Sequence, residues 1–449
     1  MNIRLKNLLV ASGLTLLLPV TLVVVLVSLI ARLIEVLVSK VFVEHKGHQQ
    51  VGLKKTILIS GGKMTKALTL ARAFHAAGHR VILAETQRYA STGHRFSFAV
   101  SKFYTIPDPQ DPNYTQALLI IIQKENVDEY VPVCSPLASF YDSYAIPSLA
   151  PFCRVVHVDP DNIVDLDDKY KFAKKAEQLG LRVPKTLLIT DPQQVVDFDF
   201  TDESRPFILK SIAYDAIRRL DLTRLPLETS EKTASFAKSL PISTDNPWIL
   251  QEFIEGDEYC THGTVIDGVL TVYCCCESSA FQINYSHVEQ ADIEEWVTHF
   301  VSAMEFTGQA SFDFIRASDD GKFYAIECNP RAHSAITLFS NRPELAMANL
   351  SSTADFYPLK PLENCRPTYW LFHELWRFVN QLRSPRDALA VVKTILTGKD
   401  SVFNWRDPLP FLMLHHWHIP SLLVKDLQEQ RGWLRIDFNI GKLVQEGGD

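Results

Sequence analysis

The segment 308–334, GQASFDFIRASDDGKFYAIECNPRAHS, constrains the fold most, because it combines two alternating apolar runs with a turn. The runs Ala310–Ile315 and Lys322–Asn329 are separated by Asp319-Asp320-Gly321, whose glycine tolerates a positive φ. An apolar alternation on both sides of a tight turn is typical of paired antiparallel strands. The segment therefore predicts a β-hairpin.

One face of this hairpin collects oxygen ligands. Side chains alternate along a strand, so Glu327 and Asn329 share a face, and Asp313 reaches the same side from the partner strand. Three hard oxygen ligands with Arg331 just beyond them suit Mg²⁺, which keeps its other positions for water and phosphate oxygens. The alternative interpretation is an antiparallel pair with one solvated acidic face.

Length, charge and cysteine usage narrow the class of protein. A chain of 449 residues exceeds the size at which one core keeps growing, so we expect two or three domains. The net charge of −7 argues against binding nucleic acid as the main role. The eight cysteines include no C-x-x-C pair, and we interpret them as buried apolar residues in a reducing compartment.

The uncharged run Asn7–Ala31 predicts a membrane-spanning helix within an anchor and linker at 1–50. At about 1.5 Å per residue, its 25 residues match an apolar layer of about 30 Å. A secretory signal is the alternative, but its apolar region is shorter and ends at a cleavage site of small residues. Cations after the run outnumber those before it, which predicts a catalytic body in the cytoplasm. Pro19 leaves a re-entrant hairpin open, and we expect 1–40 to serve attachment only.

Residues 51–160 alternate between strand and helix patterns. The run TILISGG is followed by helical spacing over 65–77 and then by RVILAE, and further strand-like runs lie near Tyr104, at 130–134 and at 155–159. This alternation predicts a Rossmann-like domain with a parallel sheet. Gly61-Gly62 resembles a dinucleotide turn, but G-x-G-x-x-G is absent.

Three later segments carry candidate ligands. A helix pattern begins at Lys169 in DKYKFAKKAEQLGLRVPKT. The strand-like PFILKS contains Lys210, a cation that a buried strand excludes unless an anion pairs with it. The run WILQEFIEGDEYC, residues 248–260, reads as a strand followed by an acidic turn.

In this order, and together with IECNPR, these segments resemble the ATP-grasp ligases. The resemblance implies an α/β and α+β multidomain fold with an ATP-grasp domain at 161–345 after the Rossmann-like domain. It implies that Asp313, Glu327 and Asn329 hold Mg²⁺, or Mn²⁺ in its place, on the phosphates of ATP. It also implies nucleotide contacts, to phosphate from Lys169 and Lys210, to adenine from Glu252, Phe253 and Ile254, and to ribose from Glu258.

Two segments depart from the family pattern or add to it. The family's phosphate loop is rich in glycine, but none occurs here between Gly180 and Gly256, and Arg218 and Arg219 are the candidates to hold phosphate instead. The polar, aromatic loop SSAFQINYSHVE predicts a lid, from which His287 contacts phosphate or substrate. The alternative for His287 is a surface histidine.

The resemblance implies an ATP-dependent ligase that phosphorylates an acceptor and lets an amine displace the phosphate. A resemblance of the whole chain to one branch of this family further implies a cyclic enol as acceptor and glycine as amine. We expect Arg331, His333 and Ser334 to hold the amine, with His333 taking the amine proton. A carboxylate–amine ligase acting through an acyl phosphate is one alternative, and a non-catalytic, membrane-tethered nucleotide-binding module is another. Residues 346–449 predict a helical extension that packs on the body.

Overall fold

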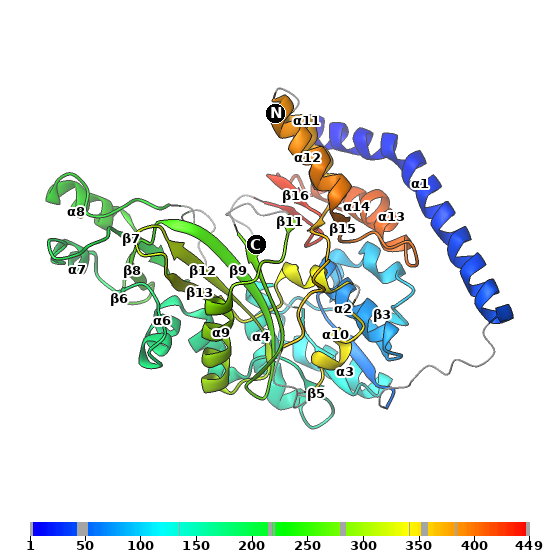
Figure 1. Cartoon of the computed structure of the whole chain (residues 1–449), viewed down its shortest axis with the longest axis horizontal. Coiled ribbons are helices and arrows are strands. Elements are labelled where there is room, and N and C mark those ends of the chain that lie inside the picture. The colour runs from blue at the N-terminus through cyan, green and yellow to red at the C-terminus, as the bar shows by residue number, and fades with distance from the viewer. Residues whose placement is uncertain are drawn as a thin grey trace.

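The computed structural model describes residues 3–42, 53–133, 135–213, 218, 221–278, 284–340, 342–351, 358–381 and 384–445. Figure 1 shows a parallel sheet and the C-terminal helices in one part of the molecule, with a small antiparallel sheet at the far end. A longer antiparallel sheet lies between them, and the N-terminal helix lies on the side opposite the small sheet.

The uncharged run forms a long helix, α1 (Ile3–Phe42), as predicted. Within its span Leu5–Val38, an 18-residue window has a mean hydropathy of 2.8, and 22% of that window is buried. By length and composition alone, this helix is able to cross a membrane. Its buried side chains recur at helical spacing and are Asn7, Leu14, Thr21, Val25 and Ser28.

The predicted parallel sheet is confirmed. Its strand order is β3-β2-β1-β4-β5, and each neighbouring pair is parallel. The order reverses between β1 and β4, so the loops after these strands diverge and leave a crevice at the carboxyl edge. The elements are β1 (Thr56–Ile59), α2 (Thr65–Ala76), β2 (Arg80–Thr86), η1 (Gln87–Tyr89), η2 (Gly93–Phe96), β3 (Lys102–Ile106), α3 (Tyr114–Glu125), β4 (Glu129–Val131), α4 (Pro136–Leu149) and β5 (Arg154–Val155).

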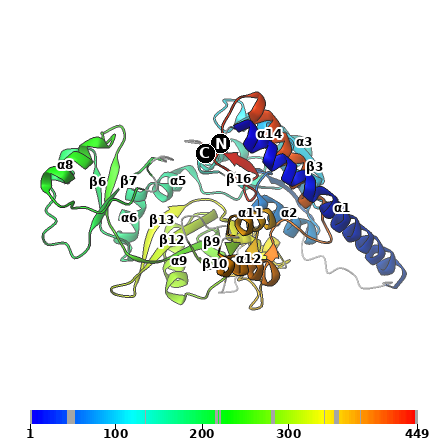
Figure 2. The same cartoon turned by 90° about the horizontal axis from the view of Figure 1, so that it is seen from above.

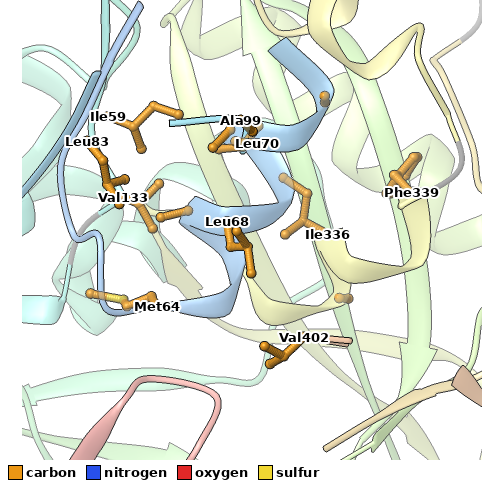
Figure 3. Packing of buried hydrophobic residues seen from close by; sticks show 14 of the residues in the cluster. Ile59, Met64, Leu68, Leu70, Leu83, Ala99, Val133, Ile336, Phe339 and Val402 are labelled. Carbon is orange, nitrogen blue, oxygen red and sulfur yellow. The ribbon is translucent and has the colours of Figure 1, made fainter. Parts of the chain in front are cut away.

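Helix α2 is buried on several sides. Figure 3 shows Leu68 of α2 between Ile59 and Leu83 of the parallel sheet and Ile336 and Phe339 from the later part of the chain. Because apolar contact on both sides removes the helix from water, α2 is fixed relative to both regions.

The small antiparallel sheet has the order β6-β8-β7. Helix α6 begins at Lys169 as predicted and buries Phe172, Ala173 and Ala176. Asp168 caps it by accepting hydrogen bonds from the N–H groups of Tyr170 and Lys171. The elements are α5 (Pro160–Asp167), α6 (Lys169–Gln178), β6 (Thr186–Ile189), α7 (Pro192–Val196), β7 (Phe207–Ser211), α8 (Ser230–Ser239) and β8 (Trp248–Glu252).

The longer antiparallel sheet has the order β10-β9-β12-β13. Its strands β12 and β13 form the predicted hairpin, and Gly321 in the turn has a φ of +69°. Helix α9 covers the sheet and packs Trp296 and Phe300 against Phe312. The elements are β9 (Gly256–Ile266), β10 (Val269–Glu277), β11 (Asn284–Tyr285), α9 (Ala291–Met304), β12 (Gly308–Ala317) and β13 (Phe323–Asn329).

The cysteines are free thiols in the part of the chain that the structure describes, which agrees with the prediction. Cys365 is half-buried, whereas Cys153, Cys260, Cys274, Cys275, Cys276 and Cys328 are buried. Burial raises the pKa of Cys153 to about 12 and raises that of Cys275 well above its ordinary value, so these thiols are not reactive thiolates. Cys134 lies outside the described residues.

The C-terminal extension packs on the body. The Arg72 guanidinium of α2 donates to Asp407 at 2.8 Å, and the Trp370 indole donates to Thr65 at 3.0 Å. The elements are η3 (Ser334–Phe339), α10 (Leu345–Ala348), β14 (Thr368–Tyr369), α11 (Leu371–Gln381), α12 (Pro385–Thr397), β15 (Lys399–Asp400), α13 (Leu409–Met413), the π-helical turn η4 (Leu414–His418), α14 (Ile419–Gln428), β16 (Arg435–Asp437) and β17 (Lys442–Val444).

Helix α1 packs along this extension, beside α14 (Figure 2). The Trp433 indole donates to Asn7 at 2.6 Å, and Asn7 donates to the Leu423 carbonyl at 3.3 Å. Farther along α1, Thr21 and His416 lie 3.0 Å apart, and Glu35 pairs with Arg406. The helix is thus a packed element of the protein and not attachment alone.

Candidate active site

Two carboxylates face each other on the hairpin. Asp313 of β12 lies directly opposite Glu327 of β13, and Ser311 lies opposite Asn329. The Asn329 amide donates to Asp313 at 3.3 Å and to Glu327 at 3.4 Å. The structure therefore brings the three predicted metal ligands together.

The ionisation of the Asp313 carboxyl group depends strongly on the charge of Glu327. Burial and the neighbouring Glu327 carboxylate raise the pKa of Asp313 well above its ordinary value. Burial opposes ionisation of Glu327, but the positive charges of Lys169 and Lys210 and the hydrogen bonds with Asp313 and Asn329 together lower the pKa of Glu327 to about 2. A divalent cation between the two carboxylates relieves their repulsion, so this donor set fits Mg²⁺.

Asn329 is the ligand that needs rearrangement. Its side-chain oxygen accepts a hydrogen bond from the Arg331 guanidinium, while its nitrogen faces the carboxylates. Rotating the side-chain amide of Asn329 by half a turn exchanges the positions of its oxygen and nitrogen. The oxygen then faces the two carboxylates. The amide then completes a set of three oxygen donors.

Cations approach the carboxylates from α6 and β13. The Lys169 ammonium, at the first position of α6, lies 3.7 Å from Glu327. Arg331 lies 3.6 Å from Asp167, at the end of α5. Burial raises the pKa of Asp167, an effect that the positive charge of Arg331 opposes. Lys169 is thus close to the Glu327 carboxylate and Arg331 to the Asp167 carboxylate.

Lys210 of β7 is the second predicted phosphate ligand. Burial lowers its pKa, and the negative charges of Glu327, Glu258 and Asp313 oppose this shift, so the ammonium faces the same site. It donates to the Gln251 side chain at 3.0 Å, and Gln251 donates to Thr186 at 3.2 Å. Sequence reasoning did not identify Gln251 as a site residue. The feature that could have identified it is a polar amide within an apolar strand, where Gln251 is only 2% exposed.

The segment after β8 is the predicted adenine edge. The N–H groups of Glu252 and Phe253 donate to the carbonyls of Lys185 and Pro206, so an adenine contact here uses carbonyls or the Ile254 amide. The Glu252 side chain pairs with Arg205 at 3.3 Å. Glu258 is exposed at the start of β9, close enough to influence Lys210 and Asp313. The roles of these four residues stay predictions.

His333 is not placed as predicted. Its Nδ1 accepts the Ala335 N–H at 3.3 Å, and its ring packs edge-on against Tyr285. Burial, with the charges of Lys66 and Arg331, lowers its pKa to about 3. An imidazole with this pKa is a weak base, so the structure contradicts the prediction that His333 titrates near pH 6.5 and accepts the amine proton.

The structure gives other contacts for the residues that were predicted to touch substrate or phosphate, whose roles stay predictions. Ser334 is buried and accepts a hydrogen bond from Asn439 at 2.7 Å. The two ring nitrogens of His287 lie 3.0 Å from the Cys275 carbonyl and 3.1 Å from Glu289, so the predicted substrate contact is not supported. The carbonyl of Arg218 accepts the Asp221 N–H at 2.8 Å, and Arg219 lies outside the described residues.

A cavity of about 370 Å³ lies next to the site, at the carboxyl edge of the parallel sheet. Ser60, Asp108 and Ser135 come from the segments after β1, β3 and β4, Glu85 comes from the carboxyl end of β2, and Arg331 connects the cavity with the metal ligands. Ligands of open α/β sheets bind at such an edge, where the strand order reverses. Sequence reasoning did not identify this set, although each residue lies at or near the end of a predicted strand.

No family model matches the chain. A curated relative, the C-terminal section of the carbamoyl phosphate synthase large chain of Methanopyrus kandleri, is 20% identical over 225 residues. The match covers 45% of this chain and 39% of that protein. The chain therefore spans about two fifths of the length of the curated relative it matches.

Several solved structures are similar. Biotin carboxylase from Campylobacter jejuni, in a β-γ-ATP complex, matches with a TM-score of 0.52 and 14% identity over 68% of this chain and 73% of that chain. N5-carboxyaminoimidazole synthetase from Staphylococcus aureus matches with a TM-score of 0.50 and 14% identity, over 70% and 82% of the two chains. The biotin carboxylase domain of Hydrogenobacter thermophilus 2-oxoglutarate carboxylase, with MgADP, ADP and bicarbonate, gives 0.52 and 12%, over 68% and 72%. This chain has the ATP-grasp fold that these structures share.

Proposed function

We propose that this chain is an ATP-dependent ligase that forms a C–N bond between a small acceptor and an amine. The main observation in support is that the side chains of Lys169, Lys210, Asp313 and Glu327 lie close together between the two antiparallel sheets. Arg331 lines the neighbouring cavity. The similar structures, among them complexes with β-γ-ATP and with MgADP, support this class of enzyme.

Each residue of the site has a separate role in the proposed reaction. Asp313, Glu327 and Asn329 would hold Mg²⁺, or Mn²⁺ in its place, which supplies charge neutralisation at the phosphates of ATP. Lys169 and Lys210 orient the triphosphate, so the terminal phosphoryl group passes to an acceptor oxygen. The amine nitrogen then attacks the carbon that bears this oxygen, the C–O bond breaks, and phosphate leaves as the nitrogen loses a proton. Arg331 suits the carboxylate of an amino acid, which it binds through two parallel hydrogen bonds.

For the substrates, we propose 4-deoxygadusol, a cyclic enol, as acceptor and glycine as amine, giving mycosporine-glycine, ADP and phosphate. The support is the resemblance of the whole chain to cyanobacterial mycosporine-glycine synthase, with its N-terminal apolar segment and the CNPRAHS and DPLPF segments. The cavity of about 370 Å³ also has room for a small ring. The alternatives are a carboxylate–amine ligase and a non-catalytic nucleotide-binding module.

The test is an incubation of the purified full-length chain with ATP, Mg²⁺ and matched acceptor–amine pairs. The proposal expects phosphate release and a product mass with 4-deoxygadusol plus glycine only. Release with simple carboxylates and none with the enol would favour the carboxylate–amine ligase. Nucleotide binding without phosphate release from any pair would favour the non-catalytic module.

We also propose that α1 attaches the protein to a membrane, with the ligase body in the cytoplasm. The support is the exposed apolar face of α1, which includes Leu16, Val23 and Leu33. Co-flotation with liposomes tests this proposal, because a chain without membrane affinity stays in the dense fractions.

A further inference from the structure

Helix α1 is held by the globular part of the chain, residues 53–445, at both ends of its uncharged run. Near the start of the helix, the Lys6 ammonium donates to the carbonyls of Trp433 and Leu434, at 2.7 and 3.0 Å. Farther along, the guanidinium carbon of Arg32 lies 3.7 Å from the centre of the Phe98 ring. These contacts flank the uncharged run, so the run lies along the globular part.

This packing leaves too little of α1 free to cross a membrane. Asn7, which bonds to the C-terminal extension, and Glu35, which pairs with Arg406, are 28 positions apart, or about 42 Å of helix at about 1.5 Å per residue. The parts of the helix beyond them, residues 3–6 and 36–42, are far shorter than the about 20 residues that a spanning helix needs. A spanning α1 would therefore have to leave the globular part and break these contacts.

The outward face of α1 is exposed and apolar. Leu16, Val20 and Val23 on this face are each at least 62% exposed. The exposed polar side chains of the uncharged run are those of Ser12 and Thr15, and the Thr15 hydroxyl donates at 2.8 Å to a backbone carbonyl within the helix. The outward face therefore offers contact to hydrocarbon and few hydrogen bonds.

Two exposed tryptophans of the C-terminal extension lie beside this helix. Trp417 follows His416, which contacts α1, and Trp405 precedes Arg406, which also contacts α1. The two tryptophans are 52% and 44% exposed. Tryptophan is enriched where a membrane meets water, because its ring is apolar and its N–H group is polar. The apolar face of α1 thus has neighbours that suit the headgroup region of a lipid layer.

A lipid leaflet fits this surface better than a protein partner does. Protein interfaces carry about one hydrogen bond per 100–200 Å² of buried area, which two small hydroxyl side chains along the run supply poorly. Hydrocarbon needs no hydrogen bonds but disfavours charge, and the run Asn7–Ala31 has no charged residue. A helix that lies on a membrane keeps its other side polar, and here the globular part covers that side.

We propose that α1 stays packed on the globular part and binds a single lipid leaflet through its outward face, together with Trp405 and Trp417, without crossing the membrane. Both ends of α1 then lie on the same side of the membrane as the candidate active site. The inference rests on the membrane attachment proposed above and is independent of the ligase reaction.

The first experiment tests whether α1 stays in place when the chain is bound to lipid. A full-length variant with Thr21→Cys and His416→Cys is floated with vesicles of phosphatidylcholine and phosphatidylglycerol and treated with a short bis-methanethiosulfonate linker. The two positions are in contact, so linking is expected to be as complete on vesicles as in mild detergent. The matched control combines Val23→Cys with His416→Cys and is expected not to link, because position 23 lies on the opposite side of the helix from position 21.

The result on vesicles distinguishes the two ways of attachment. In a spanning α1, position 21 lies about 15 Å from either surface of the hydrocarbon layer, out of reach of a globular part in water. Loss of the link on vesicles would overturn the inference and keep the membrane attachment. A chain that does not float would overturn both, and phosphate release by the same preparation reports separately on the ligase proposal.

The second experiment tests the outward face as the lipid contact. Val23→Asp is expected to lower partition into the same vesicles about tenfold or more, because a charge replaces an apolar contact. Val269→Asp, at an exposed valine of β10, is the matched control and is expected to partition as the unaltered chain does. Equal partition of the two variants would overturn the lipid contact. A lipid-free dimer that Val23→Asp dissociates would overturn it in favour of a second copy of the chain on this face.

Discussion

Asp313 and Glu327 are an unfavourable pair for the protein alone. Like charges placed opposite each other on adjacent strands destabilise a sheet, and here burial together with the negative charge of Glu327 raises the pKa of Asp313. A structure keeps such a pair at low cost only if a cation resolves it. This feature supports metal binding independently of the motif that first indicated it.

Glu327→Gln is expected to lower turnover about 100-fold or more, because it removes one carboxylate from the metal set without opening a core cavity. Asn329→Ala is expected to act in the same direction. Steady-state phosphate release measures the effect, and circular dichroism checks the fold. Glu177→Gln, at an exposed carboxylate of α6, serves as control, and near-normal activity in Glu327→Gln would show that the metal assignment is wrong.

Lys210→Ala is expected to raise the KM for ATP about tenfold, because a cation facing the phosphates is lost. Gln251→Ala is expected to produce a smaller rise in the same constant, since Gln251 positions the Lys210 ammonium. The comparison uses initial rates at varied ATP. A KM for ATP that stays constant in Lys210→Ala would transfer the phosphate contact to another cation.

At the scale of elements, local patterns predicted the hairpin of β12 and β13, the start of α6 and the parallel sheet. Each depends on side-chain alternation or capping within a few residues, so a sequence reveals it directly. The environment of His333 depends instead on the charge of Lys66 and on a ring contact with Tyr285, which come from distant segments. The packing of α1 against the C-terminal extension could not be predicted from the sequence for the same reason. Lys6 donates a hydrogen bond to the Trp433 carbonyl, which lies 427 residues away along the chain.

Asn7→Ala is expected to lower the free energy of unfolding by about 1–3 kcal/mol, because Asn7 bonds to Trp433 and Leu423 at a buried position. Thr15→Ala, on the exposed face of the same helix, is expected to change it by less than about 0.5 kcal/mol. Denaturant unfolding of the full-length chain in mild detergent measures both. Equal stability of the two variants would mean that α1 is attached only by its apolar surface.

At the scale of the whole molecule, histidines with lowered pKa values lie in the parallel-sheet region, in the longer antiparallel sheet and the segment after it, and in the C-terminal extension. Burial lowers their pKa values from the ordinary value near 6.5, to about 3 for His94, His262, His333 and His415 and to about 4 for His418. Below pH 6.5 the unfolded chain binds protons that the folded chain does not, so protonation favours unfolding.

Stability is therefore expected to fall as the pH drops from about 6.5 towards 4, by up to about 1.4 kcal/mol per pH unit for each such histidine. His415→Phe removes one titrating ring and preserves a ring that stacks on Phe372, so it is expected to flatten this dependence. Thermal unfolding between pH 7.5 and 5 measures the slope. An unchanged slope in His415→Phe would assign the acid sensitivity to carboxylates.

The contact between α1 and the C-terminal extension sets an order of events during synthesis. The ribosome releases Asn7 first, but its partner Trp433 emerges only after 426 more residues. At about 5–20 residues per second, this interval lasts roughly 20–85 s. Throughout that time the apolar surface of α1 has no intramolecular partner from α14, so a nascent chain must shelter it in a lipid layer or in a chaperone.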